Sequence, residues 1–247
     1  MRYLILTDIH GNSDALDAVL EEASTESIGS VLVLGDLVGY GAGPNEVIDR
    51  ILGLPQPTVV IRGNHDKVVA TPIQDLHFNA IARLAIRWTA EELTDSNLRY
   101  LSELPQGPLE IKPGLSICHG SPLDEDEYLL GLEGAADSFA NHPARISFFG
   151  HTHLPTLFVA ENGRLSSFGL EGEGQTIHLE PGNRYLANPG SVGQPRDRDP
   201  RAAYFIYDAG EDKIHWRRCD YAVGNAQRRI LEAGLPEVLA YRLAAGI

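Results

Sequence analysis

The sequence predicts an α/β fold organised around a mainly parallel β-sheet. In the first 66 residues, three short apolar runs each end in a polar turn that contains glycine, and apolar residues at helical spacing follow the first two turns. Repetition of strand, loop and helix favours parallel strands that are buried on both faces. The chain has 247 residues, a length at which one α/β unit can hold a single large core, so we expect one domain over residues 1–247.

The first two units show how the strands and helices are recognised. The first apolar run is too short for a helix, whereas apolar residues within 13–23 recur at helical spacing, with Asn12 or Ser13 available as the N-cap. The second strand is expected at residues 31–34. Its helix is expected to begin at Pro44, because proline is favoured in the first turn of a helix.

The remainder of the chain is richer in strands. A helical pattern covers Ile73 to Leu104 with a break near Thr94, and a second covers Asn225 to Leu243 with a break near Gly234. Residues 169–174 are expected to form a flexible loop. Further strands are expected at residues 109–111, 115–118, 146–149, 157–160, 185–187, 203–207 and 214–217.

Composition excludes several classes of protein. No apolar stretch approaches the roughly 18 residues of a membrane span, and the apolar N-terminal run is too short for a signal peptide, so we expect a soluble, cytoplasmic protein. The formal net charge of -14 argues against non-specific binding to nucleic acid, which depends on a basic surface. Cys118 and Cys219 lie far apart and provide no disulfide framework, so both are expected to be reduced and partly buried.

Acidic, amide and imidazole side chains recur where the predicted strands end. Alternate side chains of an extended chain share a face, and the carboxyl ends of parallel strands share an edge, so these groups can converge in one cleft. Such mixed ligands suit divalent Mn, Fe or Zn. Seven candidate ligands are too many for one tetrahedral site and suit two ions about 3.5 to 4 Å apart with a bridging group. The seven candidate ligands at the strand ends are Asp8, His10, Asp36, Asn64, His119, His151 and His153, and His65 and Asp66 lie next to Asn64 in the same turn.

The ordered pattern resembles the calcineurin-like metallophosphoesterase superfamily. It consists of Asp8-x-His10, Gly35-Asp36, Gly63-Asn64-His65-Asp66, His119-Gly120 and Gly150-His151-Thr152-His153, and Asn188-Pro189-Gly190-Ser191-Val192 extends it to a loop of the small bacterial phosphodiesterase and diadenosine tetraphosphatase-like members. The resemblance implies a four-layer α/β/β/α sandwich with two mixed β-sheets flanked by helices. It also implies that Asp8, His10 and His153 bind one metal, that Asn64, His119 and His151 bind a second, and that Asp36 bridges both.

A mechanism follows from these assignments. A hydroxide held between two metals is a strong nucleophile at neutral pH, and the ions offset charge that develops on the phosphoryl oxygens. His65 is not needed as a ligand and, by the resemblance, protonates the leaving oxygen. Asp66 is expected to hold the His65 imidazole in the required tautomer.

This chain differs from one branch of the superfamily at the residue that binds the substrate phosphate. The Ser/Thr protein phosphatase branch has an Asp-Arg-Gly triplet after the bridging Asp, whereas this chain has Gly39-Tyr40-Gly41 and therefore lacks the phosphate-binding Arg. Arg196 could replace it, although a surface arginine paired with Asp197 or Asp199 is nearly as compatible with the sequence. The acidic run 124–127 fits the solvated start of a helix better than the wall of a cleft.

The sequence therefore favours a cytoplasmic phosphoesterase that uses two divalent ions (Mn, Fe or Zn) on a small phosphodiester or nucleotide. Two alternatives remain. One is a Ser/Thr phosphoprotein phosphatase, which the missing Arg disfavours, and the other is a non-catalytic scaffold on the same fold, which the complete ligand set together with His65 disfavours.

Overall fold

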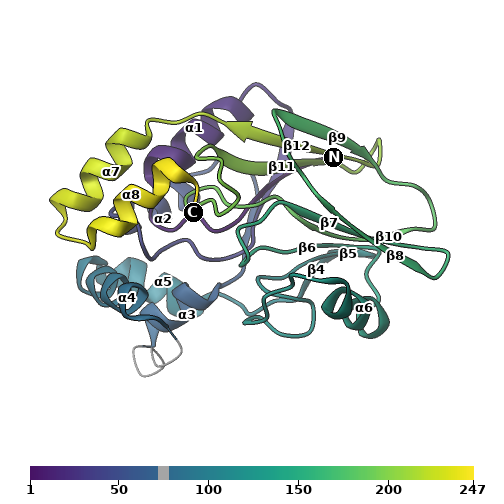
Figure 1. Cartoon of the computed structure of the whole chain (residues 1–247), viewed down its shortest axis with the longest axis horizontal. Coiled ribbons are helices and arrows are strands. Elements are labelled where there is room, and N and C mark those ends of the chain that lie inside the picture. Colours follow the sequence, from purple (N-terminus) through teal and green to yellow (C-terminus); the bar gives the residue numbers. More distant parts are fainter. Residues whose placement is uncertain (72–77) are drawn as a thin grey trace.

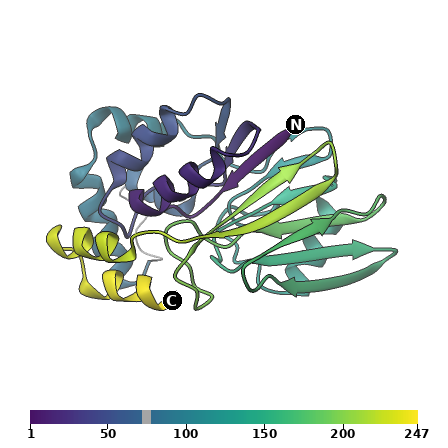
Figure 2. The same ribbon diagram turned by 90° about the horizontal axis from the view of Figure 1, so that it is seen from above.

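The structure, a computed structural model, describes residues 1–71 and 78–247. In this part of the chain two β-sheets of six strands each pack face to face, and helices cover their outer faces (Figure 1). This is the four-layer α/β/β/α sandwich that the resemblance implies. Figure 2 shows the strands of both sheets running side by side, with most of the helices gathered at one end of them.

The first sheet has the strand order β3-β2-β1-β11-β12-β9. Its three N-terminal strands are parallel, as the repeated strand–loop–helix units predict, and the other three pair antiparallel. The bounds are β1 (Arg2–Leu6), β2 (Ile28–Val33), β3 (Thr58–Val60), β9 (Gly174–His178), β11 (Ala202–Asp208) and β12 (Lys213–Cys219).

The second sheet has the order β4-β5-β6-β10-β7-β8. Its centre, β5-β6-β10, is parallel, and antiparallel strands flank this centre on both sides. The bounds are β4 (Leu109–Lys112), β5 (Leu115–Ile117), β6 (Ile146–Phe148), β7 (Thr156–Glu161), β8 (Arg164–Gly169) and β10 (Arg184–Asn188).

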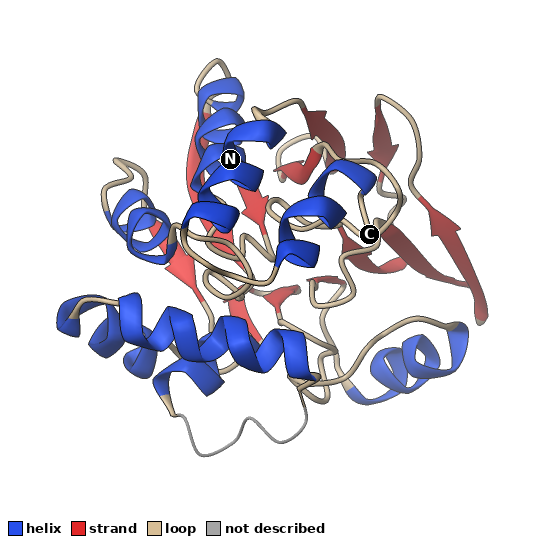
Figure 3. Ribbon diagram, turned by 60° about the vertical axis from the view of Figure 1, so that its left-hand side comes forward, coloured by secondary structure: helices blue, strands red, loops and turns tan. Residues whose placement is uncertain are grey.

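The helices lie on both sides of this pair of sheets (Figure 3). Helices α1 and α2 pack on the first sheet, α6 packs on β7 and β8 of the second, and α7 and α8 pack against each other and on α1 and α4. The bounds are α1 (Ser13–Ala23), α2 (Pro44–Leu52), α3 (Asn64–Ala70), α4 (Ala80–Glu92), α5 (Asp95–Glu103), α6 (Leu132–Asn141), α7 (Val223–Glu232) and α8 (Glu237–Ala245).

Side-chain alternation along β1 explains the layers. Tyr3 and Ile5 point into the core between the two sheets, whereas Leu4 and Leu6 pack against the helices. Both faces of this strand are therefore apolar, which is why its sequence is a continuous apolar run. Asn12 caps α1 by accepting a hydrogen bond from the backbone N–H of Ala15, as expected.

Three expectations differ from the structure or lie outside it. The loop expected at residues 169–174 covers only residues 170–173, because Gly169 ends β8 and Gly174 begins β9, an exposed edge strand whose glycine and polar residues give no apolar alternation. The acidic run 124–127 starts no helix, because Glu125 is buried and paired with Arg62 and Lys67, and the nearest helix begins at Leu132. The expected helical residues 73–77 lie outside the described part of the chain.

Both cysteines are free and buried, as expected. Within residues 1–71 and 78–247, no helix combines the length and the apolar character needed to cross a bilayer.

The contact between the sheets predicts the effect of a core substitution. Phe148 on β6 is fully buried, and its ring centroid lies 5.9 Å from that of Phe205 and 5.6 Å from that of Tyr207, both on β11. We expect Phe148→Ala to lower the free energy of unfolding by about 3 to 5 kcal/mol, measured by urea denaturation. Phe168→Ala on β8, where the ring is 52% exposed, should change it by less than about 0.5 kcal/mol. Equal effects of the two substitutions would contradict this account of the core.

Candidate metal centre

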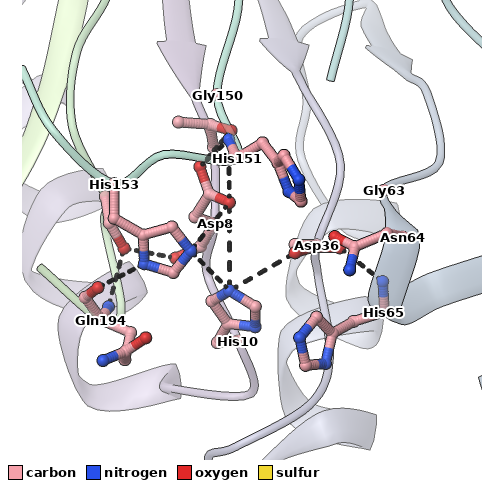
Figure 4. A network of polar contacts seen from close by, with 12 residues as sticks. Asp8, His10, Asp36, Gly63, Asn64, His65, Gly150, His151, His153 and Gln194 are labelled. Carbon is pink, nitrogen blue, oxygen red and sulfur yellow. Dashed lines mark hydrogen bonds and ion pairs between the residues drawn. The ribbon is translucent and has the colours of Figure 1, made fainter. Parts of the chain in front are cut away.

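The polar strand ends meet at one place, and both sheets contribute to it (Figure 4). Asp8 and His10 follow β1, Asp36 follows β2, His119 follows β5, and His151 and His153 follow β6. The first group of possible ligands is Asp8, His10, Asp36 and His153, and the second is Asp36, His119 and His151. Within each group all ligand atoms lie within 4.8 Å of one another, and every member is buried.

Asp36 belongs to both groups. Its Oδ2 atom lies 3.5 Å from Nε2 of His10 and 3.5 Å from Nε2 of His119, while its Oδ1 accepts a hydrogen bond of 2.9 Å from the backbone N–H of His65. The carboxylate therefore faces both groups with one oxygen and fixes the start of α3 with the other. Asn64, at that helix start, brings its Oδ1 to 3.1 Å from Nε2 of His119 and so joins the second group.

Unusual backbone conformations aim the ligands at this point. Asp8, His10, Asp36, His151 and His153 all have positive φ values, between 50° and 65°. Such conformations cost on the order of 1 to 3 kcal/mol each in residues other than glycine and persist only where the surrounding structure holds them. Backbone bonds from His10 to Asp36 and from Asp8 to Gly35 provide part of that support.

Each of the four histidines in the two groups is oriented by a main-chain carbonyl. The carbonyl oxygen can only accept, so in the neutral imidazole the ring nitrogen facing it must carry the proton, and the other nitrogen keeps its lone pair. That second nitrogen is the one that can bind a metal. The pairs are His10 Nδ1 with Val38 O, His119 Nδ1 with Leu34 O, His153 Nδ1 with Gln194 O and His151 Nε2 with Asp126 O.

These tautomers leave acceptors facing acceptors. Nε2 of His10 lies 3.2 Å from Nε2 of His153, and Nε2 of His119 faces the Asn64 oxygen. Two lone pairs at such a distance repel each other unless a proton or a cation lies between them. Carboxylate, imidazole and amide groups around one point are a ligand set that divalent Mn, Fe or Zn accepts, so the residues fit a metal in each group.

The charges in the site oppose the effect of burial. Burial alone would raise the pKa of Asp36 and of Asp8, but the surrounding imidazoles hold both values below the ordinary range. Burial lowers the pKa of His151 to about 3. Burial would also lower the pKa of His119, but the Asp36 and Asp8 carboxylates raise it to about 10. The two buried carboxylates therefore favour positive charge, from a proton or a cation, at Nε2 of His119.

His65 is adjacent to both groups but has a different environment. Its ring packs between Tyr40 and Phe78, with centroids 4.5 and 4.9 Å away, and Nδ1 is buried without a hydrogen-bond partner in the described chain. Burial lowers the pKa of His65 to about 4, and the positive charge of the nearby Arg196 contributes to the decrease. Gly39 is required here because a Cβ at that position would come within 2.4 Å of the ring.

Asp66 does not make the contact expected from the sequence. Its two oxygens accept hydrogen bonds from the backbone N–H groups of Gly63, at 3.0 Å, and Val38, at 3.2 Å, and no described contact joins it to the His65 ring. Burial and the neighbouring Asp36 raise the pKa of Asp66 to about 7. Asp66 therefore ties the loop after β2 to the start of α3, and it can orient His65 only through the backbone.

Arg196 lies beside the site. Its backbone N–H donates to the carbonyl of His153, and its guanidinium bonds Gln194 at 3.3 Å. The neighbouring acidic residues are occupied elsewhere, Asp197 by Arg218 and Asp199 by Arg201. Among the described residues, Arg196 therefore does not form the alternative surface ion pair with Asp197 or Asp199.

The structure adds two residues that sequence reasoning had not placed at the site. The Tyr40 ring contacts the rings of both His10 and His65, with centroids 4.7 and 4.5 Å away, and the Arg242 guanidinium lies 4.5 Å over the same ring. Arg242 comes from α8, about 200 residues after Tyr40 in the sequence, so no spacing rule connects the two. The only sequence feature that singled out Tyr40 is that it stands where the phosphoprotein phosphatase branch has an arginine.

The segments of this chain that resemble known proteins include all the candidate metal ligands. A family model described as the calcineurin-like phosphoesterase superfamily domain matches residues 1–212. The crystal structure of a metallophosphoesterase from Sphaerobacter thermophilus superposes with a TM-score of 0.85 and 36% identity over 100% of this chain and 99% of that chain. An uncharacterized protein of Methanocaldococcus jannaschii is 38% identical over 98% of this chain and 97% of its own length. Phosphodiesterase YfcE of Escherichia coli is 26% identical over 84% of this chain and 88% of its own length.

The close approach of Gly63 to Asp36 predicts how metal binding can be disturbed. A Cβ on Gly63 would lie 2.1 Å from Oδ1 of Asp36, so Gly63→Ala must displace the carboxylate shared by the two groups. We expect it to weaken metal binding by about 10- to 100-fold, measured as bound Mn after dialysis over a range of Mn concentrations. Gly131→Ala is the matched control, because a Cβ there meets nothing within 4 Å. Identical Mn binding by the two folded variants would show that Asp36 is not a ligand.

Proposed function

The chain belongs to the calcineurin-like phosphoesterase superfamily, and on that basis we propose that it is a two-metal hydrolase of a small phosphodiester or nucleotide. The observation that carries this proposal is the orientation of four buried imidazoles by main-chain carbonyls, which turns their free nitrogens toward two carboxylates. The similarity to a protein named as a phosphodiesterase supports a diester as substrate.

The proposed ligands fall into two sets that share one residue. Asp8, His10 and His153 would hold the first ion, Asn64, His119 and His151 would hold the second, and Asp36 would belong to both sets. Support comes from the two overlapping groups of ligand atoms and from the equal distances between Asp36 Oδ2 and the two Nε2 atoms. Mn, Fe and Zn all accept these ligand types.

When bound, two such ions would activate water as the nucleophile and offset the negative charge of the phosphoryl oxygens. The chain's own residues then have separate roles. His65 donates a proton to the leaving oxygen, and a phosphate bound beside it favours the protonated ring because opposite charges attract. Tyr40 and Phe78 restrict the ring by packing, and Asp66 fixes the backbone on which it is mounted.

Arg196 is proposed to contact the substrate phosphate. Its side chain has no carboxylate partner in the described chain, and its charge already contributes to the lowered pKa of both His65 and His153. A phosphate oxygen would supply the missing counter-charge, and a guanidinium is well suited to bind it. This replaces the phosphate-binding arginine that the phosphoprotein phosphatase branch has where this chain has Tyr40.

A comparison of substrates tests the reaction class. We expect the Mn-loaded protein to hydrolyse an aryl phosphodiester or a dinucleoside polyphosphate faster than an aryl monoester or a phosphopeptide, measured as initial rates at equal concentrations. Preference for the phosphopeptide would identify a phosphoprotein phosphatase instead. If both ions are bound and none of the four substrates is hydrolysed, the protein is a non-catalytic scaffold and not a hydrolase.

Two substitutions in the turn that begins α3 should separate metal binding from proton transfer. Asn64→Ala should lower bound Mn from two ions per chain toward one, because it removes a ligand from the second set. His65→Ala should leave two ions bound and reduce kcat by about 100-fold or more, the usual effect of losing a general acid. His178→Ala on the exposed strand β9 is the control for both measurements. Loss of metal in His65→Ala would overturn the assignment of this turn.

A further inference from the structure

We propose that the groove beside the second ligand set is a nucleobase-binding subsite with Tyr128 as its stacking platform. The inference rests on the proposed function, because it assumes that a phosphate is held at the metal centre. It narrows the substrate class to phosphate esters that carry a nucleoside.

The groove has a volume of about 430 Å³. This lies within the usual range for pockets that enclose small ligands. Asn64 and His151, two of the proposed ligands of the second ion, form part of its wall. A phosphate at the metal centre would therefore place whatever is esterified to it at the entrance of this groove.

Two aromatic rings line the groove. The Tyr128 ring stacks on the His151 ring, with centroids 3.9 Å apart and an interplanar angle of 29°, yet 52% of Tyr128 remains exposed. Phe78 meets the His65 ring edge-on, at 4.9 Å. A large ring that covers a site histidine and still presents surface to a groove is suited to stacking on a planar ligand.

Polar groups accompany the aromatic ones. Lys67 and Asp126 both line the groove, and the 53% exposed Asp126 carboxylate accepts a bond of 2.6 Å from the Lys67 ammonium. A nucleobase has two faces that stack and an edge that donates and accepts hydrogen bonds. The groove offers both kinds of contact, whereas a purely aliphatic group would use neither the ring face nor the charged pair.

The loop that carries Tyr128 is anchored in its position. The buried Glu125 carboxylate accepts hydrogen bonds from both Arg62 and Lys67, at 2.8 to 3.0 Å. At the start of the loop, the Ser121 hydroxyl accepts hydrogen bonds from the backbone N–H groups of Leu123 and Asp124. Stacking on Tyr128 therefore requires little ordering of the protein, and preorganisation of this kind favours binding.

Adenosine 5′-phosphate and ribose 5-phosphate differ only by the base and so isolate its contribution. We expect the Mn-loaded protein to bind the nucleotide about tenfold or more tightly than the sugar phosphate, measured by calorimetric titration. Tyr128→Ala should remove most of this preference by weakening nucleotide binding, while binding of ribose 5-phosphate stays unchanged. Tyr128→Phe keeps the ring and should retain the preference, and Tyr241→Ala on α8, also exposed, is the control.

Equal affinities of the wild-type protein for the two compounds would overturn the subsite. So would a Tyr128→Ala variant that loses affinity for both compounds to the same degree, because that result assigns Tyr128 only to the integrity of the metal centre. Titration reports binding without turnover, so the result is separable from the proposed function. A protein that prefers the nucleotide but hydrolyses no ester retains the subsite and loses the hydrolase.

Discussion

The donation of one imidazole N–H to a main-chain carbonyl is the interaction on which the proposed site depends. Four histidines make it, and each is thereby held in one tautomer with its other nitrogen turned inward. The carbonyls come from loops that follow strands of both sheets, at Leu34, Val38, Asp126 and Gln194. Hydrogen bonds that complete the fold therefore also determine the chemistry of the side chains inside it.

The two-sheet core holds together candidate ligands that come from both sheets. Asp8, His10 and Asp36 follow strands of one sheet, whereas His119, His151 and His153 follow strands of the other. The packed side chains between the sheets, with Phe148 against Phe205 and Tyr207, fix the strand ends of one sheet relative to those of the other. This rigid packing also explains how five candidate ligands other than glycine can occupy left-handed backbone conformations that would be unfavourable in a loop without such support.

Much of this could be predicted from the sequence, because strand ends and metal ligands leave local signals. The three parallel strands, the cap at Asn12, the helix break near Thr94 and the convergence of the polar strand ends all follow from spacing and residue type. The missed features depend on contacts between distant segments. Asp66 follows His65 in the sequence, but it accepts hydrogen bonds from backbone groups and does not contact the His65 ring. Strand β9 is an exposed edge strand without an apolar pattern. Arg242 reaches Tyr40 only because α8 packs next to the site. Tyr128 is identified as a candidate site residue only by the contact of its ring with His151, which the sequence does not indicate.

A crystal structure of the Mn-loaded protein tests the central claim most directly. Its anomalous difference map should contain two peaks per chain, about 3.5 to 4 Å apart, with the Asp36 carboxylate between them. The bound nitrogens should be Nε2 of His10, His119 and His153 and Nδ1 of His151, opposite the atoms that face the carbonyls. A single peak, or two peaks without Asp36 between them, would contradict the account.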